Sequence, residues 1–412
     1  MKRLAGGLLA LVVGASMLTA CTGGGGGTTQ SSGSSTTQSS GGNTTQSSGG
    51  DTIKIGMALE LSGAVASYGT DTAAGVEMAA DEINAAGGVN GKKIELVKYD
   101  TQSDPAVATS MATKLATQDK VIAIVAPATS GSYKAIVPVA NANKVPIVSG
   151  SATADGATQA ADGTPHPYAF RTCFSDSFQG SAMAVYAKNT LNAKSAVIFG
   201  DQSSDYAKGL AAAFKKQFSA DGGTIVDEQA YTAGDTDFSA TLTKIKAEKY
   251  DVIYLPGYYQ EVGLIIKAAR GLGITAPFLG GDGYDSPTLL ELGGASALND
   301  VHFTMFYSAL DQDPKIQKFI SDYKALPKSG GKEPSGFVAM GYDTLNFIVN
   351  AIKNASAPTG EAVATAMGQT KDWPGVTGTL SVDPATHNAI RSLVVITLKD
   401  GVQSSAEKVN AT

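Results

Sequence analysis

Cysteine is nearly absent from this sequence. The 412 residues contain two, Cys21 and Cys173, and the first lies directly after an apolar leader. Cys173 is therefore the one thiol of the remaining chain, and one thiol cannot close an internal disulfide. We expect packing alone to stabilise the folded part, with Cys173 as a buried residue.

The residues and motifs of catalysis are scarce as well. The three histidines, His166, His302 and His387, lie far apart, and none has a Glu-x-x-His partner. No Gly-x-Ser-x-Gly elbow is present, and Gly91-Lys92 and Gly331-Lys332 lack the following Ser or Thr of a phosphate loop. We expect surface or loop histidines, no metal site, no cofactor and no enzymatic activity.

Charge is sparse and slightly acidic. Charged residues make up 17% of the chain, the formal net charge is −6, and no basic block follows the leader. Binding to nucleic acid requires clustered Lys and Arg against the phosphates. A nucleic-acid partner is therefore not expected.

The chain does contain an export signal at residues 1–21. Lys2 and Arg3 precede the apolar stretch from Leu4 to Leu18, and the small residues Thr19-Ala20 stand before Cys21. This pattern resembles a bacterial lipobox, in which the cysteine becomes the lipid-modified mature N-terminus. A transmembrane anchor is the weaker interpretation because the stretch is short for a bilayer, and an ordinary secretory signal is the other alternative.

A low-complexity linker follows at residues 22–51. It contains five consecutive glycines and three copies of Thr-Thr-Gln-Ser-Ser-Gly, which start at Thr28, Thr36 and Thr44. Such a composition cannot bury a core. As a flexible coil it would reach roughly 30 Å, so a folded domain could work away from a lipid surface.

From Thr52 onward, short apolar runs alternate with segments of helical spacing. The runs Ile53–Leu59, Ile94–Tyr99, Val121–Val125 and Val145–Val148 form one series, and a second series begins near Ser195. Alternation of this kind is typical of βαβ units with parallel sheets. We predict an α/β protein with two Rossmann-like lobes.

Two hydroxyl-rich segments directly follow strands of the first series. Ala126–Ser132 comes after one strand and opens a helix, and Ser149–Thr153 comes after the next. Ligands of open α/β sheets bind at the carboxyl ends of strands, and free N–H groups at a helix start attract anions. The segments could serve only as caps and turns, but two at neighbouring strand ends favour a carboxylate pocket.

A set of motifs spread over Thr52 to about Leu398 resembles the branched-chain amino-acid-binding proteins of ABC importers. The motifs are Ile53-Lys54-Ile55-Gly56, Leu61-Ser62-Gly63, Tyr68-Gly69, Asp81 to Gly91, Tyr99-Asp100, Asp104-Pro105, Arg171 with Asp176 and Gln179-Gly180, Asp235 to Ser239, Gly257-Tyr258, Gly280 to Gly283 and Gly375 to Gly378. The resemblance implies a type I periplasmic binding protein fold. In it, two lobes joined by a three-stranded hinge close over an amino acid, and a permease reads the closed form.

The resemblance also implies site residues. Thr129 and Thr153, assisted by Ser130 and Ala152, would hold the ligand carboxylate, while the Ser151 carbonyl and Asp282 would face the ammonium. Tyr68, Tyr206 and Tyr258 would line the cleft. Phe174 and Phe337 are weaker candidates for the side-chain pocket.

Three positions depart from the leucine-binding pattern. Asp282 stands where a glutamate is usual, Thr129 where a serine is usual, and Ala128 occupies one position of a missing disulfide. The shorter aspartate requires a closer ammonium, an intervening water or a ligand that is not an α-amino acid. Without the resemblance, Gly-Asp-Gly would be ordinary turn chemistry.

The resemblance gives a domain plan and a function. We expect lobe 1 at residues 52–173, lobe 2 at 174–302, lobe 1 again at 303–390, and a final strand crossing to lobe 2 with a tail at 391–412. The expected protein is a monomeric, lipid-anchored, extracytoplasmic substrate-binding protein that delivers a small aliphatic amino acid to an ABC permease. It would lie on the cytoplasmic membrane, or in the periplasm or on the outer membrane of a two-membrane envelope. Alternatives are a binding protein for amides, urea or aromatic acids, and a tethered ligand sensor.

Overall fold

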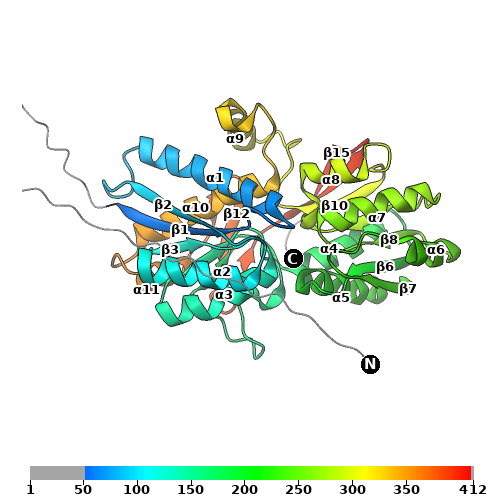
Figure 1. The fold of residues 1–412 in the computed structure, drawn as a ribbon, viewed down its shortest axis with the longest axis horizontal. Coiled ribbons are helices and arrows are strands. Elements are labelled where there is room, and N and C mark those ends of the chain that lie inside the picture. The colour runs from blue at the N-terminus through cyan, green and yellow to red at the C-terminus, as the bar shows by residue number, and fades with distance from the viewer. Residues whose placement is uncertain (1–51, 410–412) are drawn as a thin grey trace, which may run out of the picture. The chain divides into compact units, whose positions relative to one another are not determined.

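The computed structural model describes residues 52–409. Most of this part of the chain forms two open sheets that are flanked by helices (Figure 1). We call the five-stranded sheet with its helices lobe 1 and the seven-stranded sheet with its helices lobe 2. The α/β class with two parallel-sheet cores is confirmed. The leader with Cys21 and the linker lie outside the described residues.

Lobe 1 is built on a fully parallel sheet of strand order β2-β1-β3-β4-β5. Its strands are β1 (Ile53–Leu59), β2 (Ile94–Asp100), β3 (Ala123–Val125), β4 (Ile147–Ser149) and β5 (Ala169–Arg171). Its helices are α1 (Ala66–Ala85), α2 (Pro105–Lys114), the π-helix η1 (Leu115–Asp119), α3 (Ser130–Asn143), η2 (Asp155–Ala157), α10 (Gly336–Asn354) and α11 (Gly360–Gly368). The central strands are buried on both faces, which explains their continuous apolar runs.

Local sequence signals set the helix ends in lobe 1. The Asp104 carboxylate accepts hydrogen bonds from Ala106 N and Val107 N and so caps α2. Helix α1 ends before Gly87 and Gly88, whose φ values of +107° and +83° suit glycine. The paired glycines therefore end the helix.

Lobe 2 is built on a mixed sheet of strand order β15-β14-β10-β9-β8-β6-β7. Its strands are β6 (Ser195–Asp201), β7 (Thr224–Tyr231), β8 (Val252–Tyr254), β9 (Phe278–Gly280), β10 (Val301–Met305), β14 (Leu393–Lys399) and β15 (Val402–Val409). Its helices are α4 (Asp176–Asn189), α5 (Asp205–Ala220), α6 (Ser239–Ala247), α7 (Tyr259–Gly271), η3 (Asp282–Tyr284) and α8 (Pro287–Gly293). Strand β14 runs antiparallel to β10 and β15 antiparallel to β14, so most of the predicted tail is an edge strand.

A smaller group of elements follows β10. It consists of α9 (Pro314–Ala325), η4 (Pro327–Ser329), β11 (Trp373–Gly375), β12 (Gly378–Val382) and β13 (Ala389–Ile390). The three strands form a separate antiparallel sheet.

Three connections join the two large sheets within residues 52–409. They run from β5 to α4, from β10 toward α9, and from β13 to β14. Strand β10 ends at Met305, three residues past the boundary expected at residue 302. The division into lobe segments remains a proposal.

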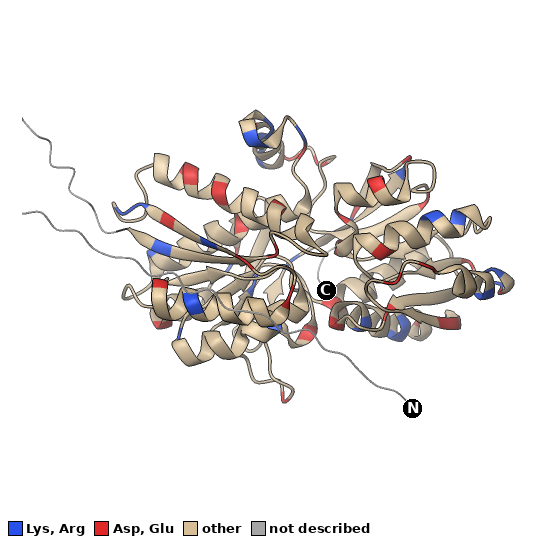
Figure 2. Cartoon of the chain, in the orientation of Figure 1, with Lys and Arg blue, Asp and Glu red and all other residues tan. Residues whose placement is uncertain are grey.

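Charge is dispersed over the ribbon. Acidic and basic positions are interspersed on the helices of both sheets (Figure 2). Within residues 52–409, no helix is long and apolar enough to cross a bilayer.

Candidate functional site

The two hydroxyl-rich segments meet at the carboxyl ends of β3 and β4. The Ser151 hydroxyl donates to the Ala128 carbonyl oxygen at 3.0 Å, and the Ala154 N–H donates to Ser130 Oγ at 3.1 Å. Thr129 is the N-cap of α3, so the free N–H groups of that helix start at this junction. The predicted pair of strand-end loops is therefore one continuous polar wall of lobe 1.

A residue that the sequence gave no reason to single out, Glu60, lies against this wall. Its carboxylate follows β1, is fully buried, and accepts hydrogen bonds from Ala128 N at 2.9 Å, Thr129 N at 3.1 Å and Thr129 Oγ1 at 2.8 Å. Burial raises the pKa of Glu60, and these hydrogen bonds oppose that shift. The Thr129 donors expected to hold a ligand carboxylate are thus bonded to a carboxylate of the protein itself.

Lobe 2 contributes a buried acid from the glycine-flanked turn after β9. Asp282 Oδ1 accepts hydrogen bonds from the Tyr206 hydroxyl at 2.9 Å and from Gln179 Nε2 at 3.1 Å. The Tyr206 ring stacks on Tyr258 with centroids 5.2 Å apart. Within the described residues, no Lys, Arg or His forms an ion pair with Asp282, which leaves a buried carboxyl without a cation.

Aromatic side chains connect the lobes above these polar groups. The Tyr68 hydroxyl, from α1, donates to the Gly283 carbonyl oxygen at 2.6 Å, and its ring stacks on Phe337 at 4.3 Å. Tyr68 also meets Tyr258 edge-on at 5.6 Å. All three predicted tyrosines therefore meet where lobe 1 contacts lobe 2.

Further contacts join the same two walls at their rim. Lys134 of α3 pairs with Asp205 of α5 at 2.7 Å, and Ser286 Oγ lies 2.9 Å from Ser67 Oγ. The lobes are thus in direct contact through these residues as well, as expected of a closed form.

The acids of the site titrate abnormally. Burial raises the pKa of Asp282 to about 7, and hydrogen bonds from Gln179 and Tyr206 oppose the shift. Burial also raises the pKa of the nearby Asp285 to about 6. An ionised Asp282 is therefore unfavourable until a positive group approaches it.

The predicted residues are brought together, with one at the margin. The candidates Thr129, Ser130, Ser151, Ala152 and Thr153 lie together in the two strand-end loops of lobe 1, and Asp282 comes from lobe 2. Phe337 contacts Tyr68, whereas Phe174 stacks on Phe306 at 4.7 Å beside the hinge. Their roles toward a ligand remain predictions.

Cys173 and Arg171 occupy the first hinge connection. Cys173 is a free, buried thiol, and burial raises its pKa to about 12 despite the nearby Arg171. Arg171 Nη1 donates to the carbonyl oxygens of Thr153 at 2.7 Å and Ala154 at 2.8 Å. Burial therefore keeps the thiol protonated, and the arginine holds the second hydroxyl loop in place.

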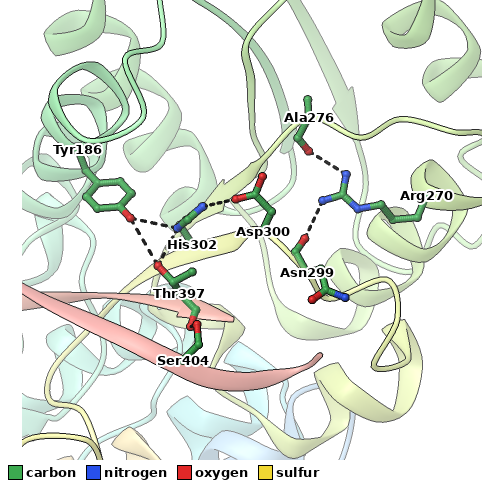
Figure 3. A network of polar contacts seen from close by, with 8 residues as sticks. All are labelled: Tyr186, Arg270, Ala276, Asn299, Asp300, His302, Thr397 and Ser404. Atoms are coloured by element: carbon green, nitrogen blue, oxygen red, sulfur yellow. Dashed lines mark hydrogen bonds and ion pairs between the residues drawn. The ribbon is translucent and has the colours of Figure 1, made fainter. Parts of the chain in front are cut away.

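The histidine expectation was wrong for His302. This residue lies in β10, is 4% exposed, and contacts Tyr186 Oη at 3.2 Å, Thr397 Oγ1 at 2.9 Å and Asp300 Oδ1 at 2.9 Å (Figure 3). It links helix α4 to strands β10 and β14. In the same view Arg270 donates to the carbonyl oxygens of Ala276 and Asn299, so the network braces lobe 2.

Among residues 52–409, no group of three or more His, Cys, Asp or Glu side chains is arranged to hold a metal ion.

Comparison with known proteins identifies the family. A family model described as periplasmic binding protein matches residues 52–403. The Leu/Ile/Val-binding protein BraC3 of Rhizobium johnstonii is 34% identical over 327 residues, which cover 79% of this chain and 86% of that protein.

Solved structures similar to this chain come from the same family as its sequence relatives. The substrate-binding protein LivJ of Streptococcus pneumoniae, in complex with isoleucine, has a TM-score of 0.81 and 41% identity, covering 87% of this chain and 99% of that one. The leucine-binding protein LivK of Thermotoga maritima has a TM-score of 0.80 and 35% identity over the same shares. The chain therefore belongs to the periplasmic binding protein family and resembles the branched-chain amino-acid substrate-binding proteins of ABC transporters over nearly all of its described length.

Proposed function

We propose that this protein captures a small amino acid, branched-chain or otherwise aliphatic, between its two lobes and delivers it to an ABC permease. The observation that carries the proposal is Asp282, a fully buried carboxyl that is held by Tyr206 and Gln179 and lacks a cation within the described residues. A ligand ammonium would supply that cation. The names of BraC3 and the isoleucine complex of LivJ support the same ligand class.

The ligand carboxylate would lie against lobe 1. The N-terminus of α3 offers N–H groups and a partial positive charge beside Ser130. The Thr153 hydroxyl is buried and makes no hydrogen bond of regular geometry in the described chain, although it lies beside the Asp176 carboxyl. Because Glu60 already accepts from Thr129, we assign the carboxylate to Thr153, to Ser130 and to the start of α3, with Thr129 as part of the wall.

The remaining groups would select the ligand's size and polarity. The Ser151 carbonyl and Asp282 would face the ammonium. Tyr68, Tyr206 and Tyr258 would cover the ligand, with Phe337, and more remotely Phe174, beside its aliphatic side chain.

Binding would act through a population shift. The Tyr68 to Gly283 hydrogen bond and the Lys134 to Asp205 ion pair exist only when the lobes meet. A ligand that contacts both walls stabilises that state relative to an open one. No bond of the ligand is made or broken, and transport energy would come from ATP hydrolysis in separate subunits.

The N-terminal pattern adds a location. With Cys21 lipidated and residues 22–51 as a tether, a monomer would work on the outer side of a membrane. Cys21 and the linker lie outside the described residues, so this part of the proposal depends on the sequence.

One observation favours a second candidate, a binding protein for amides or urea. Glu60 already uses the Ala128 and Thr129 donors of the wall expected to bind a carboxylate. A ligand without a carboxylate would not compete with Glu60 there.

A thermal-shift screen of the full chain in mild detergent separates these candidates. Common amino acids, urea, short amides and aromatic acids would each be added, and a ligand at one hundred times its Kd stabilises a protein by about 2.7 kcal/mol. A shift with leucine, isoleucine or valine supports the proposal. Stabilisation only by ligands without an ammonium overturns the assignment of Asp282.

A further inference from the structure

Two buried acids of lobe 2 share one amide. Gln179 Nε2 donates to Asp176 Oδ1 at 3.0 Å and to Asp282 Oδ1 at 3.1 Å. The orientation of the amide is fixed, because Gln179 Oε1 accepts from the Thr304 hydroxyl at 2.6 Å and from Asp282 N at 3.4 Å. Gln179 therefore holds two carboxyl groups in a defined pair.

The Tyr206 hydroxyl is oriented in the same way. It accepts from Gly283 N at 2.9 Å, so its own proton points to Asp282 Oδ1. Asp282 Oδ1 thus accepts hydrogen bonds from two side chains, whereas the Asp176 carboxyl accepts one, from Gln179.

Two buried oxygen atoms next to Asp176 Oδ1 have hydrogen-bonding capacity that the protein leaves unused. Asp176 Oδ2 and Thr153 Oγ1 are both fully buried, and neither makes a hydrogen bond of regular geometry in the described residues, although the Thr153 hydroxyl lies close enough to Asp176 to lower its pKa. They belong to opposite walls and are joined through the backbone, because Asp176 N donates to the Thr153 carbonyl oxygen at 2.8 Å. A buried carboxyl oxygen and a buried hydroxyl are rarely left without a partner unless a ligand or water completes them.

We propose that Asp176 is a second carboxyl of the ammonium subsite, and that the ligand's ammonium binds to the pair Asp176 and Asp282 with release of a proton from Asp176. This inference depends on the proposed function, since it assumes a ligand with an ammonium group. The Thr153 hydroxyl stands at the junction, where it can accept from the ammonium and donate to the carboxylate of one α-amino acid.

Many titratable groups surround Asp176 and Asp282, but most of them are acids or tyrosines. The titratable and charged groups around it are Asp155, Asp285, Cys173, Tyr68, Tyr206, Tyr254, Tyr258, Arg171 and Arg391. Neither arginine forms an ion pair with the two acids in the described chain. Both guanidinium groups donate to backbone carbonyl oxygens instead.

Two carboxylates in such a site do not ionise together. Burial raises the pKa of Asp176 well above its usual value, the Thr153 hydroxyl lowers it, and the charge of Asp282 raises it further. Burial and the neighbouring charge therefore favour a proton on Asp176 in the unliganded pair. An arriving ammonium lets both acids ionise, and the carboxyl O–H proton passes to the buffer while the ammonium keeps its own three.

Calorimetry with L-leucine tests the inference on the full chain in mild detergent. Titrations at pH 8 in two buffers of different ionisation enthalpy give the number of protons released per ligand. Asp282 is ionised at this pH, so we expect the wild type to release close to one proton, from Asp176. We expect no release with 4-methyl-2-oxopentanoate, which has the leucine skeleton but no ammonium.

Variants identify the source of the proton. Asp176→Asn should abolish the release at pH 8 and weaken leucine binding roughly tenfold to hundredfold, the value of a charge-assisted hydrogen bond. Gln179→Met removes the bridge but keeps both acids, and it should also weaken leucine binding. This variant replaces Asp176→Asn in the test if Asp176→Asn does not fold. Asp285→Asn, a neighbouring buried acid outside the pair, should release the wild-type number of protons.

The outcomes separate this inference from the proposed function. Leucine binding without proton release at pH 8, or wild-type affinity and release in Asp176→Asn, overturns the role of Asp176 alone. A wild type that binds no amino acid overturns both.

Discussion

The Arg391 guanidinium donates a 2.8 Å hydrogen bond to the Thr172 carbonyl oxygen and so joins the third hinge connection to the first. It also donates to the carbonyl oxygens of Phe306 at 3.4 Å and Thr377 at 2.6 Å. Phe306 follows β10 on the second connection. One buried side chain therefore contacts all three connections between the lobes.

Replacing Arg391 tests whether this clamp stabilises the hinge. In Arg391→Met, buried carbonyl oxygens lose their donor, and each such loss costs about 1–3 kcal/mol. We expect a lower free energy of unfolding in urea titrations. Lys353→Met, which replaces an exposed cation of α10, serves as the control and should leave stability unchanged. Equal stability of Arg391→Met and the wild type would contradict the clamp.

Glu60 is expected to position the lobe 1 wall. In the wild type, Glu60 Oε2 accepts from Ala128 N and Oε1 accepts from Thr129 N and Thr129 Oγ1, and Glu60→Gln replaces one of these two acceptor oxygens by an N–H₂ donor. At least one of these donors then lacks an acceptor, at a cost of about 1–3 kcal/mol. We expect a lower melting temperature and weaker leucine binding by calorimetry. Tighter leucine binding would instead mean that Glu60 competes with the ligand carboxylate for these donors.

The stability of the unliganded protein should depend on pH through its buried acids. Because the folded-state pKa values of Asp282 (about 7) and Asp285 (about 6) lie above their unfolded values, the folded protein binds more protons between pH 4 and 7. The contribution of these acids is fully present below about pH 4 and is lost as the pH rises through 7. Urea midpoints should therefore fall from pH 5 to pH 8, and the double replacement by Asn should flatten the profile. An unchanged slope in that variant would contradict the assignment.

Much of the fold followed from the sequence because its signals are local. The apolar run Ile53–Leu59 acts within a few residues, and it gave the boundaries of β1. Strand β15 was missed because it is an exposed edge strand with a polar sequence. Its existence depends on pairing with β14 rather than on its own pattern.

The site was predictable only in part, for the same reason. The resemblance singled out Tyr68, Tyr206 and Asp282, which lie together in the structure, while their role toward a ligand remains a prediction. Glu60 has no local signal, since its partners Ala128 and Thr129 stand 68 and 69 residues later in the chain. Burial of His302 likewise follows from the neighbours of β10 in the sheet and not from the residue's own sequence context.

The lipid anchor can be tested independently of ligand binding. Cys21→Ala removes the sulfur that would carry the lipid, so the protein should leave the membrane fraction after cell lysis. Leucine affinity should not change, because Cys21 precedes the whole of the described chain. Immunoblots of membrane and soluble fractions give the result, with the size of the product showing whether the leader was cleaved. Membrane association of a cleaved Cys21→Ala product would contradict the anchor.

Asp282→Asn is the sharpest test of the ligand class. At pH 8 the wild-type carboxyl is ionised, and loss of one partner from a buried ion pair costs about 3–5 kcal/mol. We expect leucine affinity to fall by at least about a hundredfold. The unliganded variant should be as stable as the wild type at this pH or more so, because a buried charge has been removed. Lost affinity together with retained stability assigns Asp282 to the ligand, whereas unchanged affinity makes it a turn residue between two glycines.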